Sequence, residues 1–454
     1  MNKKIFIILV AVLIICPFLI LFISRFYTVQ DLMRPPRIYG DNEKIQTAFE
    51  NSLKGKENLI LKYPTEGEYR SSFVMYDVDM DGQEEVLVFY TLKSDETIVR
   101  VNILDKVDGK WKSVSDFAGY GSEISSISFV DMNNDGYNEI VICWNLYESK
   151  TSKVVTIHKI IEENGKISGL KTLANESCSY FKMVDLDGDG DTEMFLTQID
   201  SSKDTPKACA KLLKMSKKET VSIVGEVSLD GFVSGYSSFK VEEDSKNGPT
   251  KIFIDANKGE HQMITEVVYW DKENSKLVAP FFDNETLTNF RTLRTPGISS
   301  MDIDGDGKIE IPTDTVKRNN LALDMSGANE ISVGITQWCA INNDELVPKV
   351  NSLVNYSDLY ILLIDDSDVD SILAYNNLKQ RQLTVYQRTQ EGTRGNELFS
   401  IITVAVGEWL SNPKENYSIL KRNNSIVYAY SITKDGEKAG IKPETLISNI
   451  KIMQ

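Results

Sequence analysis

Histidine is nearly absent from this sequence, since only His158 and His261 occur. His158 lies in the apolar run "KVVTIHKII", which is typical of a packed or surface-facing strand, and His261 lies in a predicted loop. The GxSxG, HExxH and P-loop motifs are also missing. The common sequence signatures of serine hydrolases, zinc proteases and nucleotide hydrolases are therefore excluded.

Cysteine is scarce as well, with five residues and no CxxC pair. The sequence therefore carries no zinc-finger or thioredoxin-like motif. Cys143 and Cys339 lie in strand-like apolar runs, and we expect both to be core thiols. Only Cys178 and Cys209 are candidates for a disulfide, which an extracytoplasmic location would permit.

Basic residues are outnumbered, with 50 lysines and arginines against 66 acidic residues and a net charge of −16. Nucleic-acid binding needs a basic surface, so this composition argues against it. An acidic excess indicates either a solvated surface or a concentration of cation sites. The 454 residues suggest two or three domains.

Long hydrophobic runs are absent except at the N-terminus, where Lys3 and Lys4 precede an uncharged segment from Ile5 to Ser24. A run of about 20 apolar residues is long enough to span a bilayer as a helix. We therefore predict a membrane anchor over residues 1–33, with the bulk of the chain extracytoplasmic. The alternative is a cleaved or lipidated form through Cys16, although Ile15 occupies the place where a lipoprotein signal has a small residue.

A linker and a short helix are predicted over residues 34–66. The prolines of "RPPRIYG" disfavour a helix at 34–40, whereas "DNEKIQTAFENSLKG" predicts one from Asp41 to Gly55. Its apolar face is expected to pack on the first domain and consists of Ile45, Ala48, Phe49, Ser52 and Leu53.

One nine-residue pattern recurs along the middle of the chain. "DVDMDGQEE" begins at 77, "DMNNDGYNE" at 131, "DLDGDGDTE" at 185 and "DIDGDGKIE" at 302, and a degenerate copy, "EDSKNGPTK", begins at 243. We name these the first to fifth loops in chain order. Their near-even spacing of 54 to 59 residues indicates an internal structural repeat.

Each repeat is predicted to form four short strands, because apolar, β-branched and aromatic runs alternate with turn residues. Four strands repeated at this period are typical of the blades of a β-propeller. The predicted fold is therefore mostly β, with a β-propeller of about five four-stranded blades over residues 67–352. The transmembrane helix lies before it and a small C-terminal α+β domain after it.

The loop pattern favours calcium over other functions. Asp or Asn at positions 1, 3 and 5 can direct oxygens around a hard cation, and Gly at position 6 permits the sharp turn. An EF-hand has a glutamate at position 12 followed by a helix. Here position 12 is Val88, Ile142, Leu196 or Thr313, the acid lies at position 9, and a strand-like run follows. The EF-hand interpretation therefore fails.

The pattern resembles the FG-GAP or VCBS repeat, the calcium-loop blade of integrin α-subunit propellers and of bacterial surface proteins. The resemblance implies side-chain ligands at positions 1, 3, 5 and 9 and a backbone carbonyl at position 7. In the four intact loops these residues are Asp77, Asp79, Asp81, Gln83 and Glu85; Asp131, Asn133, Asp135, Tyr137 and Glu139; Asp185, Asp187, Asp189, Asp191 and Glu193; and Asp302, Asp304, Asp306, Lys308 and Glu310.

About four calcium ions are therefore expected. In the fourth loop Glu243, Ser245 and Asn247 are plausible ligands, but Lys251 replaces the acid at position 9, so we predict no calcium there. The ammonium of Lys251 would supply the positive charge instead. The alternative for all the loops is a set of metal-free Asp/Asn-Gly turns.

Residues 353–454 lack the loop pattern. Apolar runs and a final segment opened by Pro443, "KPETLISNIKIM", predict a small α+β domain with an antiparallel sheet, which resembles the C-terminal domain of clostridial repeat-bearing lipoproteins. The alternative is that the tail continues the propeller.

Taken together, these features predict a membrane-anchored, extracytoplasmic, calcium-binding propeller. We expect it to be a non-catalytic module that binds an unidentified protein or glycan at the cell surface, because propellers present loops suited to recognition. The alternative is an extracytoplasmic polysaccharide hydrolase or lyase, which would need an acid pair outside the loops.

Overall fold

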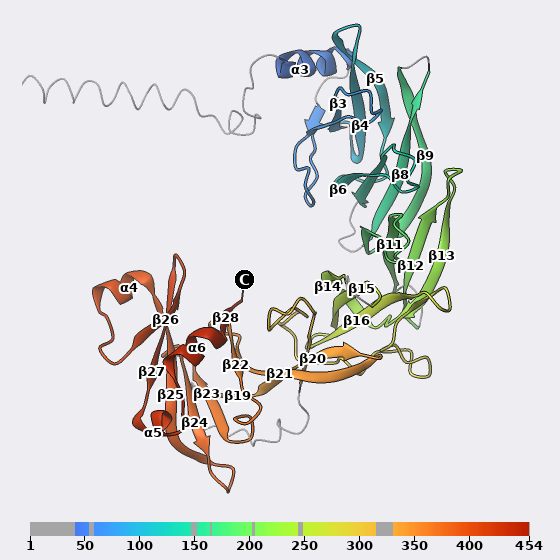
Figure 1. Ribbon diagram of the computed structural model, residues 1–454. Coiled ribbons are helices and arrows are strands. Elements are labelled where there is room, and N and C mark those ends of the chain that lie inside the picture. The colour runs from blue at the N-terminus through green and yellow to red at the C-terminus, as the bar shows by residue number, and fades with distance from the viewer. Residues whose placement is uncertain are drawn as a thin grey trace, which may run out of the picture. The chain divides into compact units, whose positions relative to one another are not determined.

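The structure, a computed structural model, describes residues 41–53, 59–146, 152–163, 166–201, 205–243, 248–314 and 330–453. The described chain is mostly β and forms six sheets (Figure 1). It divides into two compact units. Of the described residues, the first comprises those up to 130, 137–146 and 156–175, and the second comprises 131–136, 152–155 and those from 176 onward.

The first sheet contains the strands around the first loop. Strand β3 pairs with both β1 and β2 on one side and with β4 on the other, and β5 closes the sheet. The bounds are β1 (Leu59–Leu61), β2 (Phe73–Tyr76), β3 (Glu85–Leu92), β4 (Asp95–Val107) and β5 (Lys110–Ala118). The four strands predicted for this repeat are confirmed, and β1 is an addition.

The predicted N-terminal helix is confirmed as α3 (Asp41–Ser52). Its apolar face packs on the first sheet, with Ile45, Phe49 and Leu53 all buried. The Phe49 ring lies edge-on to Tyr90 of β3, with ring centroids 5.3 Å apart. The apolar residues at positions i, i+4 and i+8 lie on one face of the helix, and their burial against the sheet stabilises it.

The next three sheets each follow the predicted order of four consecutive strands. The second contains β6 (Glu123–Val130), β7 (Glu139–Asn145), β8 (Lys153–Glu162) and β9 (Ile167–Cys178). The third contains β10 (Tyr180–Val184), β11 (Glu193–Asp200), β12 (Lys207–Met215) and β13 (Val221–Leu229). The fourth contains β14 (Val233–Glu242), β15 (Lys251–Lys258), β16 (Gln262–Asp271) and β17 (Lys276–Val278).

The strands that follow the first and second loops are buried on both faces. Every residue of β3 from Glu85 to Thr91 is buried, and so is every residue of β7 from Glu139 to Trp144. Within the second unit, apolar residues of the third and fourth sheets share one core cluster, and the fourth and fifth sheets share another. Face-to-face packing of successive sheets therefore buries strands that could not be covered within one sheet.

The fifth sheet differs from the prediction at both ends. The stretch predicted as its first strand, "GISSMDID", makes only an isolated bridge between Met301 and Glu310. The sheet runs β18 (Ile311–Asp314), β20 (Ile335–Asn342), β21 (Glu345–Asn355), β22 (Tyr360–Ile364) and β28 (Ile450–Ile452). Position 352, where the predicted propeller ends, thus lies inside β21, and the tail contributes two strands.

The sixth sheet is antiparallel and, with the helices, comes mostly from the predicted tail. Its order is β19 (Glu330–Val333), β23 (Ile372–Asn377), β24 (Gln382–Arg388), β25 (Arg394–Ala405), β27 (Ile426–Ile432) and β26 (Ser418–Arg422). Strand β19 lies before residue 353, so the run predicted as one strand of the fifth repeat, "ISVGITQWCAI", is divided between two sheets. The helices are α4 (Val406–Ser411), α5 (Lys434–Lys438) and α6 (Pro443–Asn449). The predicted final helix is therefore shorter than expected, because Ile450 is buried in β28 against β22.

Two further expectations concern the termini and the thiols. The predicted membrane anchor lies outside the described residues, and no helix within them is long and apolar enough to cross a membrane. Cys143 and Cys339 are buried, as expected. Cys178 and Cys209, the candidate disulfide pair, both remain thiols.

Candidate metal centres

The four intact loops share one backbone geometry. The glycine at position 6 has a φ of 88° to 94° in Gly82, Gly136, Gly190 and Gly307. Its N–H donates to the carboxylate of the aspartate at position 1 over 2.8 to 3.1 Å. A side chain at position 6 would be strained in this left-handed region. The glycine therefore lets the loop close around its own acids.

The glutamate at position 9 begins the buried strand after each loop. Glu85, Glu139, Glu193 and Glu310 are each 1% exposed or less. In the first, third and fifth loops one carboxylate oxygen, Oε2, accepts the N–H of the residue at position 2 over 2.9 to 3.1 Å. The loops therefore differ in whether the other oxygen, Oε1, has a positively charged partner.

The structure brings together acids from three of the predicted sites. Carboxylate oxygens lie within 4.8 Å of one another in three groups, which are Asp77, Asp79 and Glu85; Asp185, Asp187, Asp189 and Glu193; and Asp302, Asp304 and Asp306. Acidic clusters of this kind can hold metal ions. The backbone N–H at position 7 of Gln83, Asp191 and Lys308 donates to the position-5 carboxylate. The carbonyl role predicted for position 7 remains a prediction.

The acids of the first loop are less well compensated than those of the third and fifth loops. Glu85 Oε1 and Asp77 Oδ1 are buried and accept no hydrogen bond within the described residues. Burial, with smaller contributions from the charges of Asp79, Asp105 and Asp81, raises the pKa of Glu85 to about 8. Burial likewise raises the pKa of Asp79 to about 6. Ionised, these acids would repel one another, so the loop fits a divalent cation.

The third loop holds an ammonium among its acids. Lys214 of β12 places Nζ 3.0 Å from Asp187 Oδ2 and 3.0 Å from Glu193 Oε1, and it also pairs with Asp189. Its hydrogen bond lowers the pKa of Asp189. Burial would lower the pKa of Lys214, but the surrounding carboxylates outweigh it and raise that pKa. The loop therefore has an internal cation.

The fifth loop also holds an ammonium, which comes from a strand that is not adjacent to the strand following the loop. Lys349 of β21 lies 3.1 Å from Asp304, 2.5 Å from Asp306 and 3.0 Å from Glu310 Oε1. Its hydrogen bond lowers the pKa of Asp306. As in the third loop, Oε1 of the position-9 glutamate meets an ammonium.

The second and fourth loops are not among the three acid groups described above. Residues 131–136 of the second loop belong to the second compact unit and Glu139 to the first, so the ligands predicted there are divided between the units. In the fourth loop residues 244–247, including Ser245 and Asn247, lie outside the described residues. Lys251 there lies 3.0 Å from Glu242 Oε1, consistent with the predicted role of its ammonium as an internal positive charge.

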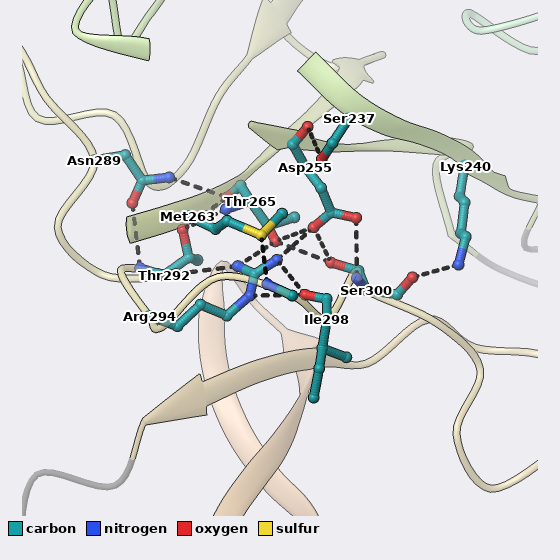
Figure 2. A network of polar contacts seen from close by, with 11 residues as sticks. Ser237, Lys240, Asp255, Met263, Thr265, Asn289, Thr292, Arg294, Ile298 and Ser300 are labelled. Carbon is teal, nitrogen blue, oxygen red and sulfur yellow. Dashed lines mark hydrogen bonds and ion pairs between the residues drawn. The ribbon is translucent and has the colours of Figure 1, made fainter. Parts of the chain in front are cut away.

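A buried polar network lies beside the fifth loop and was not predicted from the sequence (Figure 2). Arg294 Nη2 donates to Asp255 Oδ1 over 2.7 Å, and these side chains are 3% and 1% exposed. Arg294 also donates to Thr265 Oγ1 and to the carbonyl of Ile298, and the Ser300 N–H donates to Asp255 Oδ2. The network ties residues 294–300 to β15 and β16, so it supports the segment leading into the fifth loop.

A second buried group has the acid strength that general acids need. Burial raises the pKa of Glu266 to about 7. Its carboxylate accepts the Asp230 N–H over 2.8 Å and the Asn289 side-chain amide over 3.2 Å, and it is 1% exposed. A general acid must reach its substrate. Glu266 is enclosed, so it anchors the chain around Asn289.

His158 is a packed strand residue. It is 1% exposed, Nε2 lies 2.8 Å from Thr156 Oγ1, and Nδ1 lies 3.1 Å from Thr172 Oγ1. Burial lowers its pKa to about 4. No acid orients the ring in these contacts, so a catalytic role gains no support.

Comparisons with known proteins identify no family. No family model and no curated protein matches the chain. The rhamnogalacturonan lyase YesW has 11% identity and a TM-score of 0.28, over 73% of this chain and 72% of that chain. The periplasmic gluconolactonase PpgL of Pseudomonas aeruginosa has 12% identity and a TM-score of 0.27, over 76% and 95%. Sqt1 from Chaetomium thermophilum has 9% identity and a TM-score of 0.28, over 76% and 93%. These scores are too low to support a functional inference.

Proposed function

We propose that this chain is a calcium-binding repeat protein of the FG-GAP or VCBS type, whose successive four-stranded sheets are the blades of a β-propeller. In this proposal the N-terminal segment anchors it in the cell membrane, the remainder is extracytoplasmic, and the blades form a non-catalytic module that binds a protein or glycan. Calcium supports the scaffold, and the surface loops recognise the partner.

One observation supports calcium most strongly. Glu85 is fully buried, one of its oxygens accepts the Val78 N–H, and the other has no hydrogen-bond partner in the described part of the chain. A buried carboxylate without compensation is costly. Asp77 and Asp79 contribute further oxygens within 4.8 Å. Calcium accepts such a set of protein oxygens more readily than magnesium, which usually keeps several of its waters.

Three acids outside the loops are buried and committed to internal hydrogen bonds. Asp230, Asp255 and Glu266 are each 1% exposed, and each is engaged by the hydrogen bonds that anchor the segment before the fifth loop. A glycoside-cleaving acid pair must flank the scissile bond of its substrate. The alternative of a polysaccharide hydrolase or lyase therefore gains no support from these acids.

Chelation tests the calcium proposal. Thermal unfolding of the full chain should be measured with excess chelator and again after excess calcium is restored. At a free calcium concentration of about 100 times the dissociation constant, one site stabilises the folded state by about 2.7 kcal/mol, so the melting temperature should rise. An unchanged melting temperature under both conditions would refute the proposal.

Two assays test the binding role. The full chain should be incubated with a panel of polysaccharides in calcium, and hydrolysis or lyase products should be measured. Turnover that is abolished by substituting acids outside the five loops would refute a non-catalytic function. Retention of a glycan or protein on the immobilised chain, in calcium and without turnover, would support it.

A further inference from the structure

The residue facing the position-9 glutamate differs in charge between the first and third sheets. In the third sheet Met194 pairs with Leu213, which places Lys214 opposite Glu193. In the first sheet Val86 pairs with Leu104, and the same register places Asp105 opposite Glu85. The equivalent position thus brings a cation to one loop and an additional anion to the other.

The fifth sheet brings a lysine to its loop by a different path. Ile311 pairs with Cys339, which places the small Ala340 opposite Glu310. Lys349 comes from the next strand, β21, at a register shift where Trp338 pairs with Val350 and Cys339 with Pro348. A β-bulge of this kind redirects a side chain. Lys349 thereby reaches Glu310 Oε1 at 3.0 Å.

The first loop has no such ammonium. Among the described residues, no lysine or arginine forms an ion pair with Asp77, Asp79, Asp81 or Glu85, and Glu85 Oε1 is buried without a hydrogen-bond partner. The charge of Asp105 acts on both Asp79 and Glu85. The same side chains are therefore left to an external cation here and to an internal one in the third and fifth loops.

We propose that these cross-strand residues decide which loops need calcium: Asp105 makes the first loop a calcium site, whereas Lys214 and Lys349 are resident cations that replace calcium in the third and fifth loops. This inference rests on the proposed calcium binding and revises its number of ions. Asp105 is a positioning acid of the first site, since it increases the negative potential around the ligands.

Competition between the two kinds of cation explains the effect. Calcium entering the third loop must displace an ammonium that already contacts Asp187, Asp189 and Glu193. It must also tolerate that ammonium nearby, where like charges repel. In the first loop calcium displaces no protein cation and meets one more carboxylate, that of Asp105. Affinity should therefore differ strongly between loops with the same motif.

Calcium stoichiometry of the full chain, measured by isothermal titration with CaCl₂, tests this directly. Asp105→Lys should remove about one ion per chain, because the first loop then resembles the third. Lys214→Met and Lys349→Met should each add about one ion, because each empties a loop of its ammonium. Asp95→Lys on β4 and Lys207→Met on β12 are matched controls, since both residues are exposed and lie on the same strands.

The outcomes separate this inference from the proposed function. If the wild-type chain binds no calcium, the proposed function fails. If it binds calcium but all three variants keep the wild-type stoichiometry, calcium binding stands and the role of the cross-strand residues is wrong. Circular dichroism should accompany each titration, and Asp105→Asn offers a milder variant that should weaken the first site by about tenfold or more.

A measurement on the wild-type chain needs no variant. Reductive methylation followed by mass spectrometry reports the accessibility of each lysine. Lys214 and Lys349 should be modified more slowly than the exposed Lys207, equally with and without saturating calcium. Faster modification of Lys214 and Lys349 when calcium is added would mean that the metal expels them, and the inference would be overturned.

Discussion

Replacing Glu85 with glutamine should stabilise the calcium-free protein at alkaline pH, although it removes a predicted metal ligand. The glutamine Oε1 can keep the hydrogen bond from the Val78 N–H, which Glu85 accepts over 2.9 Å. The substitution removes the ionisable group whose pKa rises from 4.5 to about 8 in the folded chain through burial and then through the charges of Asp79, Asp105 and Asp81.

The pKa determines the sign and size of this effect. Between pH 4.5 and about 8 the folded chain holds a proton on Glu85 that the unfolded chain has released. The stability of the calcium-free wild type therefore falls as pH rises through this window. The displacement of the pKa corresponds to about 5 kcal/mol as an upper limit. Glu85→Gln should escape this loss, and it should match the wild type near pH 4.

Urea denaturation in chelator at pH 5 and pH 8.5 measures the difference, with and without the substitution. In saturating calcium the order should reverse at pH 8.5, because the wild type gains binding energy that the variant lacks. Equal destabilisation by Glu85→Gln at both pH values in chelator would refute the reasoning. That result would mean that Glu85 contributes through packing or hydrogen bonding alone.

Two further substitutions and the titration of one histidine give testable predictions. Phe49→Ala should lower the free energy of unfolding by about 3–5 kcal/mol in denaturant titrations, whereas the exposed Gln46→Ala should change it by less than about 0.5 kcal/mol. Arg294→Ala should cost about 3–5 kcal/mol by leaving its carboxylate partner buried and unpaired, while Arg291→Ala, at an exposed ion pair, should cost less than about 1 kcal/mol. The imidazole signals of His158 in NMR should stay those of the neutral form down to about pH 5, because burial holds its pKa near 4; its contribution to stability is lost as pH falls from 6.5 to about 4.

The sequence predicted the local geometry of the loops well because that geometry depends on residues close together in the chain. Gly82 at position 6 and Glu85 at position 9 have the backbone and burial that the motif implies. The strands after the loops begin where the apolar runs begin, as β3 does at Glu85. The apolar runs of strands and the residues of turns are short-range signals. The sequence of a single repeat is therefore enough to place its loop and strands.

The cations that fill the loops could not be predicted in this way. Lys214 lies far along the chain from Asp187, and Lys349 is farther still from Asp304. Their contacts depend on strand register and, for Lys349, on a bulge opposite Trp338 and Cys339. Register and bulges are set by packing between sheets, and a motif search does not encode them.

The C-terminal boundary of the predicted propeller was placed inside a strand for a related reason. Strand β22, "YILLI", is a short apolar run that could belong to any sheet, and its pairing with β21 assigns it to the fifth sheet. The last strand, β28, joins the same sheet from the end of the chain, nearly 90 residues after β22. Non-local pairing of this kind leaves no periodic trace in the sequence.

The distribution of resident cations also bears on how calcium acts on the whole chain. The first loop lies in the first compact unit, whereas the third and fifth loops lie in the second. If Lys214 and Lys349 hold their loops without metal, calcium stabilises the first unit much more than the second. Ligand binding raises the stability only of the folded region that contains the site. A fall in calcium would then loosen the sheet carrying α3 while the sheets beyond Glu176 keep their structure, so one repeated motif would give two regions of different metal dependence.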